Sequence, residues 1–242
     1  LALLVLTGCG GESVPDVPHA SDTAEDRNGT SRVASNGNLK RFGVMPSFGD
    51  LDTMVERRIV RVLTVYGPGR YFLEDGPRGT VQEYADKLQK VINETFRTGL
   101  LTVQVAVIPV SRDQLFPALE NGYGDIVMAG TTITDTRQES ADFTNPVSKP
   151  LREILITGPS APAIGGLEDL SGRTVHTRLS SSYADSVLQL SERLRAQGRA
   201  GIRIEAVDES LEDEDLIEMV DAGLLPWALS LIHISEPTRP VM

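Results

Sequence analysis

Short apolar strands alternate with amphipathic helices from residue 51 to residue 222, and this alternation constrains the fold more than any other feature. Runs rich in Val, Ile and Leu are typical of buried strands, and apolar residues three or four apart are typical of helices packed on one face. The predicted strands are 59–65, 101–108, 125–129, 153–157, 173–177 and 202–207. The predicted helices are 51–58, 80–96, 112–120, 182–197 and 213–222, with a helical turn at 167–170. The pattern predicts an α/β fold built on largely parallel sheets.

Two of these helices are long enough to predict which side chains they bury. In helix 80–96 the predicted inward residues are Val81, Tyr84, Leu88, Val91 and Ile92. In helix 182–197 they are Ala184, Val187, Leu188 and Leu194. Each set has helical spacing on one face, so we expect both helices to cover a sheet.

The charge of the chain excludes several classes of partner. Its 242 residues include 34 Asp and Glu against 23 Lys and Arg, a formal charge of −11. Nucleic-acid binding needs basic patches, so we expect no nucleic-acid partner, and a basic membrane-surface helix is disfavoured for the same reason. A single cysteine can form neither an internal disulfide nor a cysteine-based zinc cluster, and we expect no metal and no cofactor.

The N-terminus has the features of the end of a bacterial lipoprotein signal peptide. The apolar run 1–6 is too short to span a bilayer, and two small or polar residues separate it from Cys9. This segment resembles a lipobox, which implies that Cys9 is lipidated; the alternative is a chance cysteine beside an ordinary apolar strand. Gly10, rather than Asp, after the cysteine favours the periplasmic face of the outer membrane. Because the chain begins without Met or a basic segment, we expect its true start to lie upstream.

Segments on both sides of the predicted domain are not expected to fold with it. Residues 10–49 are rich in Ser, Gly, Asp, Asn and Pro, which predicts a flexible linker after the lipid anchor. Residues 229–239 resemble a translated sequencing-library adapter, and the alternative is a natural strand and turn. We therefore exclude 229–242 from the fold prediction and expect the natural sequence to be interrupted near Ala228.

The segment 124–137 carries the residues best suited to bind an anion. A predicted strand ends there in a threonine-rich loop, and Thr134 is placed to cap the helical turn that carries Arg137. Hydroxyls, backbone N–H groups and a guanidinium suit a carboxylate, and open α/β sheets bind ligands beyond the ends of their strands. The alternative is a capped turn whose arginine forms a surface ion pair.

Residues 124–146 resemble the hallmark of the family 3 bacterial solute-binding proteins. The shared pattern is a Gly-Asp strand, the motif Thr-x-Thr-x-x-Arg that ends at Arg137, and Asp-Phe-Thr-x-Pro after it. The resemblance implies a two-lobed periplasmic-binding-protein fold of type II that closes on a small ligand. It also implies that Arg137 binds the ligand's carboxylate, with Thr132 and Gly130 beside it.

The facing wall of the cleft is predicted at 178–183, where the family has a Gly-Ser/Thr turn that opens a helix. Ser181 and Ser182 match the positions that close over the ligand, Arg178 is an additional cation, and Ser180 replaces the usual glycine. Backbone N–H groups at a helix start can bind an anion. For each serine the alternative is a plain helix N-cap.

Two further parts of the family's site match less closely. Tyr66 follows the first strand, where family members often stack an aromatic ring on the ligand, but the residue suits a core or a lid equally well. The family's amino-acid binders hold the ligand's ammonium with a late acidic residue, which is expected just after Trp227, where the adapter-like tail begins. We predict lobe 1 at 50–157 and lobe 2 at 158–228, and we expect the domain to be incomplete.

A further resemblance is to the sensor-type domain of lipoproteins of the membrane-bound lytic murein transglycosylase F type. It rests on segments 50–54, 170–176, 180–183 and 211–215. It implies an amino-acid- or peptide-like ligand and a catalytic domain beyond this part of the chain. Such enzymes need a catalytic glutamate in a Glu-Ser motif. Glu139 and Ser140 match the dipeptide but lie inside the solute-binding hallmark, so we assign them no catalytic role.

Three functions are compatible with the pattern. The leading one is a lipid-anchored extracytoplasmic domain that binds a small solute and regulates an attached transglycosylase. The alternatives are the substrate-binding lipoprotein of an ABC amino-acid transporter and a transglycosylase enzyme whose catalytic domain lies outside this segment. A pure envelope scaffold would not need Arg137 in a strand-end loop.

Two remaining features are predicted to be structural. The acidic run 209–214 lacks the spacing of a calcium loop, so we expect a solvated helix start. His176 has no second histidine or cysteine near it in the sequence, which favours a structural role.

Overall fold

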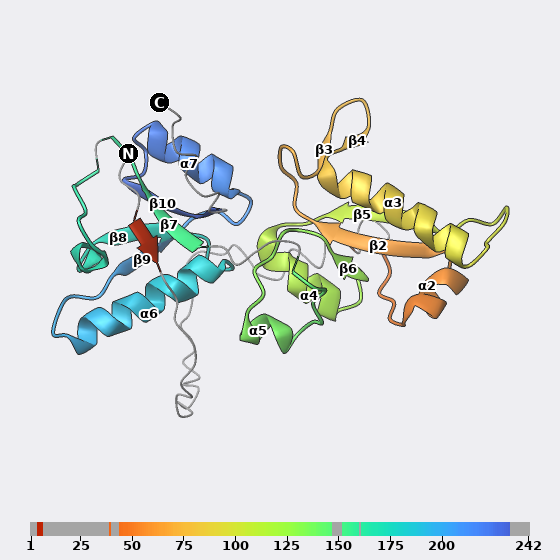
Figure 1. Cartoon of the computed structure of the whole chain (residues 1–242), viewed down its shortest axis with the longest axis horizontal. Coiled ribbons are helices and arrows are strands. Elements are labelled where there is room, and N and C mark those ends of the chain that lie inside the picture. Colours follow the sequence, from red (N-terminus) through yellow and green to blue (C-terminus); the bar gives the residue numbers. More distant parts are fainter. Residues whose placement is uncertain (1–3, 7–38, 40–43, 147–151, 160, 233–242) are drawn as a thin grey trace, which may run out of the picture.

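The computed structural model describes residues 4–6, 39, 44–146, 152–159 and 161–232, which form two α/β lobes (Figure 1). Lobe 1 contains the described residues from 39 to 146, and lobe 2 contains residues 4–6 and those from 152 to 232. The α/β class and the two-lobed architecture expected from the sequence are thereby confirmed. None of the helices in the described ranges combines the length and the apolar character needed to cross a membrane.

Lobe 1 is built on three parallel strands in the order β5-β2-β6. Alternate side chains of the central strand point to opposite faces. Val60 and Val62 pack under helix α3, whereas Leu63 and Val65 pack with Leu115 of helix α4 on the other side. The elements are α2 (Leu51–Glu56), β2 (Ile59–Thr64), β3 (Phe72–Leu73), β4 (Pro77–Arg78), α3 (Thr80–Thr95), β5 (Gln104–Pro109), the 3-10 helix η1 (Arg112–Gln114), α4 (Leu115–Glu120), β6 (Ile126–Val127) and α5 (Asp135–Gln138).

The buried face of α3 differs from the predicted one. Val81, Ala85 and Ile92 are buried, whereas Tyr84 and Val91 are more than half exposed. The sheet contacts a stripe centred on Ala85, so the two larger side chains beside it lie on the solvent side. In lobe 2 the same correction applies to Leu188, which is exposed.

The segment 44–49, predicted to belong to the flexible linker, packs on lobe 1. The guanidinium of Arg61 is buried, and it donates to the carbonyl oxygens of Met45 and Ser47, each at 2.9 Å. The same guanidinium pairs with Asp125 at 2.7 Å and donates to the carbonyl of Gly122. A buried cation needs such partners, and residues 45 and 47 supply two of them. The segment 44–49 therefore belongs to lobe 1, although the predicted boundary is at residue 50.

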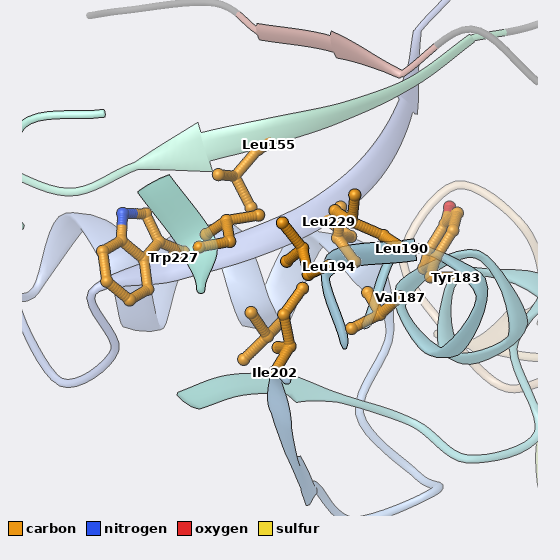
Figure 2. Close-up of a cluster of buried hydrophobic side chains, with 10 residues drawn as sticks. Leu155, Tyr183, Val187, Leu190, Leu194, Ile202, Trp227 and Leu229 are labelled. Carbon is orange, nitrogen blue, oxygen red and sulfur yellow. The ribbon is translucent and has the colours of Figure 1, made fainter. Parts of the chain in front are cut away.

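Lobe 2 contains a parallel pair, β8 and β9, and an antiparallel sheet in the order β1-β7-β10. Helix α6 covers a core that includes Leu155, Val187, Leu194, Trp227 and Leu229 (Figure 2). The elements are β1 (Leu4–Leu6), β7 (Arg152–Thr157), the 3-10 helix η2 (Leu167–Leu170), β8 (Thr174–Thr177), α6 (Ser182–Ala196), β9 (Arg203–Ala206), α7 (Asp213–Asp221) and β10 (Trp227–Ile232).

Strand β7 lies in the second lobe, although the sequence-based boundary assigned it to the first. Leu155 is buried with α6 residues, and β7 pairs antiparallel with β10 along its whole length. This pairing brings residues 229–232 of the predicted tail into the sheet, with Leu229 and Ser230 buried. Cys9, most of the predicted linker and residues 233–242 lie outside the described residues.

Candidate ligand-binding cleft

Arg137 lies where the two lobes meet. It sits in the short helix α5, which Thr134 caps by accepting the backbone N–H of Arg137 at 3.3 Å. Its Nη1 donates to the Thr132 carbonyl of the same loop at 2.9 Å, and its Nη2 donates to the Ser180 carbonyl of lobe 2 at 2.9 Å. The guanidinium carbon lies 5.5 Å from the centre of the Phe116 ring. The side chain is therefore oriented by a cap, an aromatic ring and one carbonyl from each lobe.

The electrostatic surroundings of Arg137 favour an incoming anion. Within the part of the chain that the structure describes, no carboxylate forms an ion pair with its guanidinium. Burial lowers the pKa of Arg137, the negative charge of Asp185 opposes this shift, and the positive charge of Arg112 adds to it. A carboxylate placed here would relieve the desolvated positive charge.

Thr132 and Ser182, which the sequence analysis assigned to two walls of one cleft, face each other across the same junction. Their hydroxyl oxygens are 3.4 Å apart. Gly130 has a φ of +60°, a conformation that strains other residues, and an added Cβ would lie 3.0 Å from Nη1 of Arg70. Glycine at this position therefore permits the close approach of a second lobe 1 arginine.

Two predicted ligand contacts have internal partners instead. Arg178 is only 3% exposed; it donates to Asp213 at 2.5 Å and to the Leu211 carbonyl, both in lobe 2. Ser181 is buried, and its hydroxyl donates to the Arg178 carbonyl at 2.7 Å. The Arg178 bonds hold the turn before α6 against α7, and the Ser181 bond lies within that turn, so the structure does not bring these side chains to the cleft with Arg137.

Tyr66 lines a cavity of about 350 Å³ between the lobes. The side chain is 55% exposed, so it belongs to neither core. Lobe 1 supplies most of the wall, including Val65, Pro109 and Arg112, and lobe 2 supplies Glu209, Ser210 and Glu212. Arg137, Thr132 and Ser182 do not line this cavity. The structure thus separates the predicted site into an Arg137 side and a Tyr66 side.

The acidic run 209–214 is not the solvated helix start that we expected. Glu212 is buried, and it accepts hydrogen bonds from Arg112 of lobe 1. Glu209 accepts the backbone N–H and the hydroxyl of Ser180, and Asp213 accepts the hydroxyl of Tyr183 at 2.6 Å. An acidic residue before the helix with Asp215 three residues later is a local capping signal, but nothing local indicates the arginine partners.

Two further residues were predicted to have no functional role, and a metal site was not expected. His176 lies 3.4 Å from Glu205 on the neighbouring strand. Glu139 is exposed at the end of α5. Among the residues that the structure describes, no three His, Cys, Asp or Glu side chains gather in an arrangement that could hold a metal ion.

Comparisons with known proteins agree with the two-lobed architecture. The bacterial extracellular solute-binding proteins, family 3, match residues 60–226. Over 123 residues, 50% of the chain, it is 35% identical to a membrane-bound lytic murein transglycosylase F from Desulfosudis oleivorans, of which the match covers 25%. Over 58 residues, 24% of the chain, it is 45% identical to a probable histidine-binding protein from Neisseria gonorrhoeae, of which the match covers 21%. The matches thus span a quarter or less of these curated relatives.

Solved structures share the fold over most of the chain. An ancestral arginine-binding protein bound to arginine is 25% identical, with a TM-score of 0.53 over 72% of this chain and 70% of that one. An amino-acid ABC transporter substrate-binding protein from Streptococcus pneumoniae, bound to L-arginine, is 16% identical, with a TM-score of 0.58 over 75% and 71%. Because the family match runs from β2 to the residue before β10, the chain belongs to the bacterial extracellular solute-binding proteins of family 3, with a periplasmic-binding-protein fold of type II.

Proposed function

We propose that this chain binds a small amino-acid- or peptide-like solute between its two lobes, with Arg137 as the contact for the ligand's carboxylate. The observation that carries the proposal is the guanidinium of Arg137, which lies at the lobe junction without a carboxylate partner among the described residues. Its two hydrogen bonds to carbonyls use only part of its donor set, and a planar fork matches a carboxylate well.

The relatives support an amino acid as the class of ligand. The names of the histidine-binding relative and of the arginine-bound structures describe α-amino acids, each of which carries a carboxylate. A peptide with a free C-terminus would present the same group. The side chain or the rest of the peptide would extend toward the Tyr66 cavity, whose volume of about 350 Å³ suits a small solute.

Calorimetric titration with L-arginine, L-histidine and peptidoglycan-derived peptides tests this proposal. We expect Arg137→Ala to weaken the ligand that binds by a factor of tens to thousands, because losing one partner of a buried charge pair costs about 2–5 kcal/mol. Arg137→Lys should recover only part of the affinity, because a point charge does not reproduce the paired donors.

A matched control is Arg193→Ala, which removes an exposed arginine of α6. It should leave the affinity unchanged, and circular dichroism should show both variants folded. A folded Arg137→Ala protein with wild-type affinity would overturn the assignment of Arg137.

As the wider role, the proposal favours the regulatory domain of a lytic transglycosylase, since the similarity to transglycosylase F covers half of the chain. A substrate-binding protein of an amino-acid ABC transporter is the second candidate, favoured by the histidine-binding relative and the transporter-type structural neighbour. Long-read sequencing of the gene distinguishes them. A reading frame that continues into a domain with a Glu-Ser motif would support the enzyme link, and a stop codon soon after β10 would favour transport.

The location that fits this role is extracytoplasmic, with lipid on Cys9 as the anchor to the outer membrane. The supporting observations are the lipobox-like sequence before Cys9 and the extracellular character of the family. Metabolic labelling with a fatty-acid analogue, in a gene carrying its natural start, should label the wild type. Equal labelling of a Cys9→Ala variant would overturn the anchor.

A further inference from the structure

Glu212 is the acidic residue at which the two lobes are tied together. It is the N-cap of α7 in lobe 2, and it is 5% exposed. Its carboxylate accepts hydrogen bonds from Arg112, at 2.9 Å from Nε and at 2.5 Å from Nη2. Nη2 of Arg70 lies 3.9 Å away. Both arginines belong to lobe 1, so one carboxylate of lobe 2 faces two cations of the other lobe.

Both arginines bond to the residue before the loop 130–137. This loop carries Arg137 and forms one wall of the candidate cleft, here called the Arg137 wall. Nη1 of Arg70 donates to the Ala129 carbonyl at 3.1 Å, and Nη1 of Arg112 donates to the same oxygen at 3.3 Å. Ala129 precedes the loop of Gly130 and Thr132. A change in the distance between Glu212 and these arginines therefore moves α7 and the rest of lobe 2 relative to this wall.

The pair is shielded from solvent, unlike the ion pairs on the surface. The side chains of Arg112 and Glu212 are 15% and 6% exposed, whereas those of Lys90 and Glu94 are 75% and 67% exposed. Burial acts to lower the pKa of Arg112, but the hydrogen bond and the charge of Glu212 outweigh it and raise the pKa. Shielded pairs are screened less by salt, and charge-assisted hydrogen bonds are stronger than neutral ones.

We propose that Arg112 and Glu212 are positioning residues whose ion pair latches the two lobes together in the ligand-free protein. The latch sets the distance between Ser182 of lobe 2 and Arg137 of lobe 1. A ligand then enters while the pair is broken, and the pair forms again as the lobes close. That a ligand enters between the lobes rests on the proposed function. The closure of the lobes by the ion pair does not depend on any ligand.

The test measures the distance between the lobes without ligand. Nitroxide labels are placed on cysteines substituted for Glu83 of α3 and Glu192 of α6, both exposed, with Cys9 replaced by serine. Electron–electron double resonance then gives the distribution of distances between them. We expect one dominant distance in the labelled parent protein.

Arg112→Glu places two carboxylates against each other, and like charges in such a position repel strongly. We expect it to shift most of the population to different, broader distances. Arg112→Gln, which keeps the α7 cap intact, should lower the ratio of closed to open protein about tenfold or more. The control is Glu94→Lys, which reverses the charge in the exposed pair within lobe 1 and should leave the distribution unchanged.

A folded Arg112→Glu protein with the parent distribution would overturn the latch. If that variant does not fold, Arg112→Gln and Glu212→Gln decide the matter, since glutamine removes the charge of either partner but keeps a polar side chain; unchanged distributions in both would overturn the latch equally. Because no ligand is present, failure of the latch leaves the Arg137 titrations unaffected, and failure of those titrations leaves the latch unaffected.

Discussion

Arg137 in lobe 1 and Arg178 in lobe 2 were predicted to act together on a ligand, but their surroundings differ. Arg137 is partly exposed, and its hydrogen bonds go to carbonyl oxygens of two lobes. Arg178 is buried, and it pairs with the carboxylate of Asp213 inside one lobe. The first cation remains able to accept a carboxylate, and the second already has one.

The difference shows that an arginine near a cleft can be assigned to ligand binding only when its own hydrogen-bond partners are known. A buried arginine without a carboxylate would be costly, so Asp213 is part of what allows Arg178 to be buried. Arg137 donates its hydrogen bonds to neutral carbonyl groups, and it can replace these bonds with bonds to the carboxylate of a ligand. Substitutions that treat the two residues alike should therefore have opposite consequences for stability and binding.

The largest expected effect is that of Arg178→Ala on stability. We expect the free energy of unfolding to fall by about 3–5 kcal/mol, because Asp213 and the Leu211 carbonyl lose a buried partner. Arg137→Ala should change it by less than about 1 kcal/mol. Urea denaturation of the two variants measures both values. If the two variants were equally stable and Arg178→Ala no longer bound ligand, Arg178 would be a ligand contact after all.

Asp125 tests whether lobe 1 has a buried pair of the same kind. Burial acts to raise the pKa of Asp125, but the hydrogen bonds from Arg61 and Arg57 outweigh it and lower the pKa from its ordinary 3.8. A lowered folded-state pKa contributes stability that is complete above the unfolded pKa and is lost as the pH falls through the folded pKa. Asp125→Asn should therefore cost about 3 kcal/mol at pH 7, and its difference from the wild type should shrink below about pH 3.8.

Denaturation at pH 7 and at pH 3 measures this dependence. Glu94→Gln is the control, since its exposed pair with Lys90 should contribute less than about 0.5 kcal/mol at either pH. A constant difference between wild type and Asp125→Asn across this range would mean that the carboxylate is not stabilised by its arginines.

The smallest expected effect separates two adjacent serines. Ser181→Ala should lower the free energy of unfolding by about 1 kcal/mol and leave binding intact, because its hydroxyl bonds to the Arg178 carbonyl inside lobe 2. Ser182→Ala should leave stability nearly unchanged and weaken the ligand, because its hydroxyl faces Thr132 across the cleft. Denaturation and calorimetry on both variants would contradict the comparison if the two effects were exchanged.

The strands and helices could be predicted because their signals are local. The apolar spacing that begins at Ile59 and Thr80 corresponds to β2 and α3, and the hydroxyl-rich loop correctly indicated the cap that Thr134 provides for Arg137. The buried face of α3 was less predictable, since Tyr84 and Val91 have the right spacing but lie outside the stripe that the sheet contacts.

The sequence by itself determined the α/β class, the order of its elements and the loop that carries Arg137, because hydrophobic period and capping residues act over a few positions. Only the tertiary structure decided which charges meet. Arg112 and Glu212 are 100 residues apart in the chain, and Arg178 and Asp213 are 35 apart. No local pattern encodes such pairs. They form because burial between packed elements removes water from a cation and makes a carboxylate from a distant segment its most favourable partner.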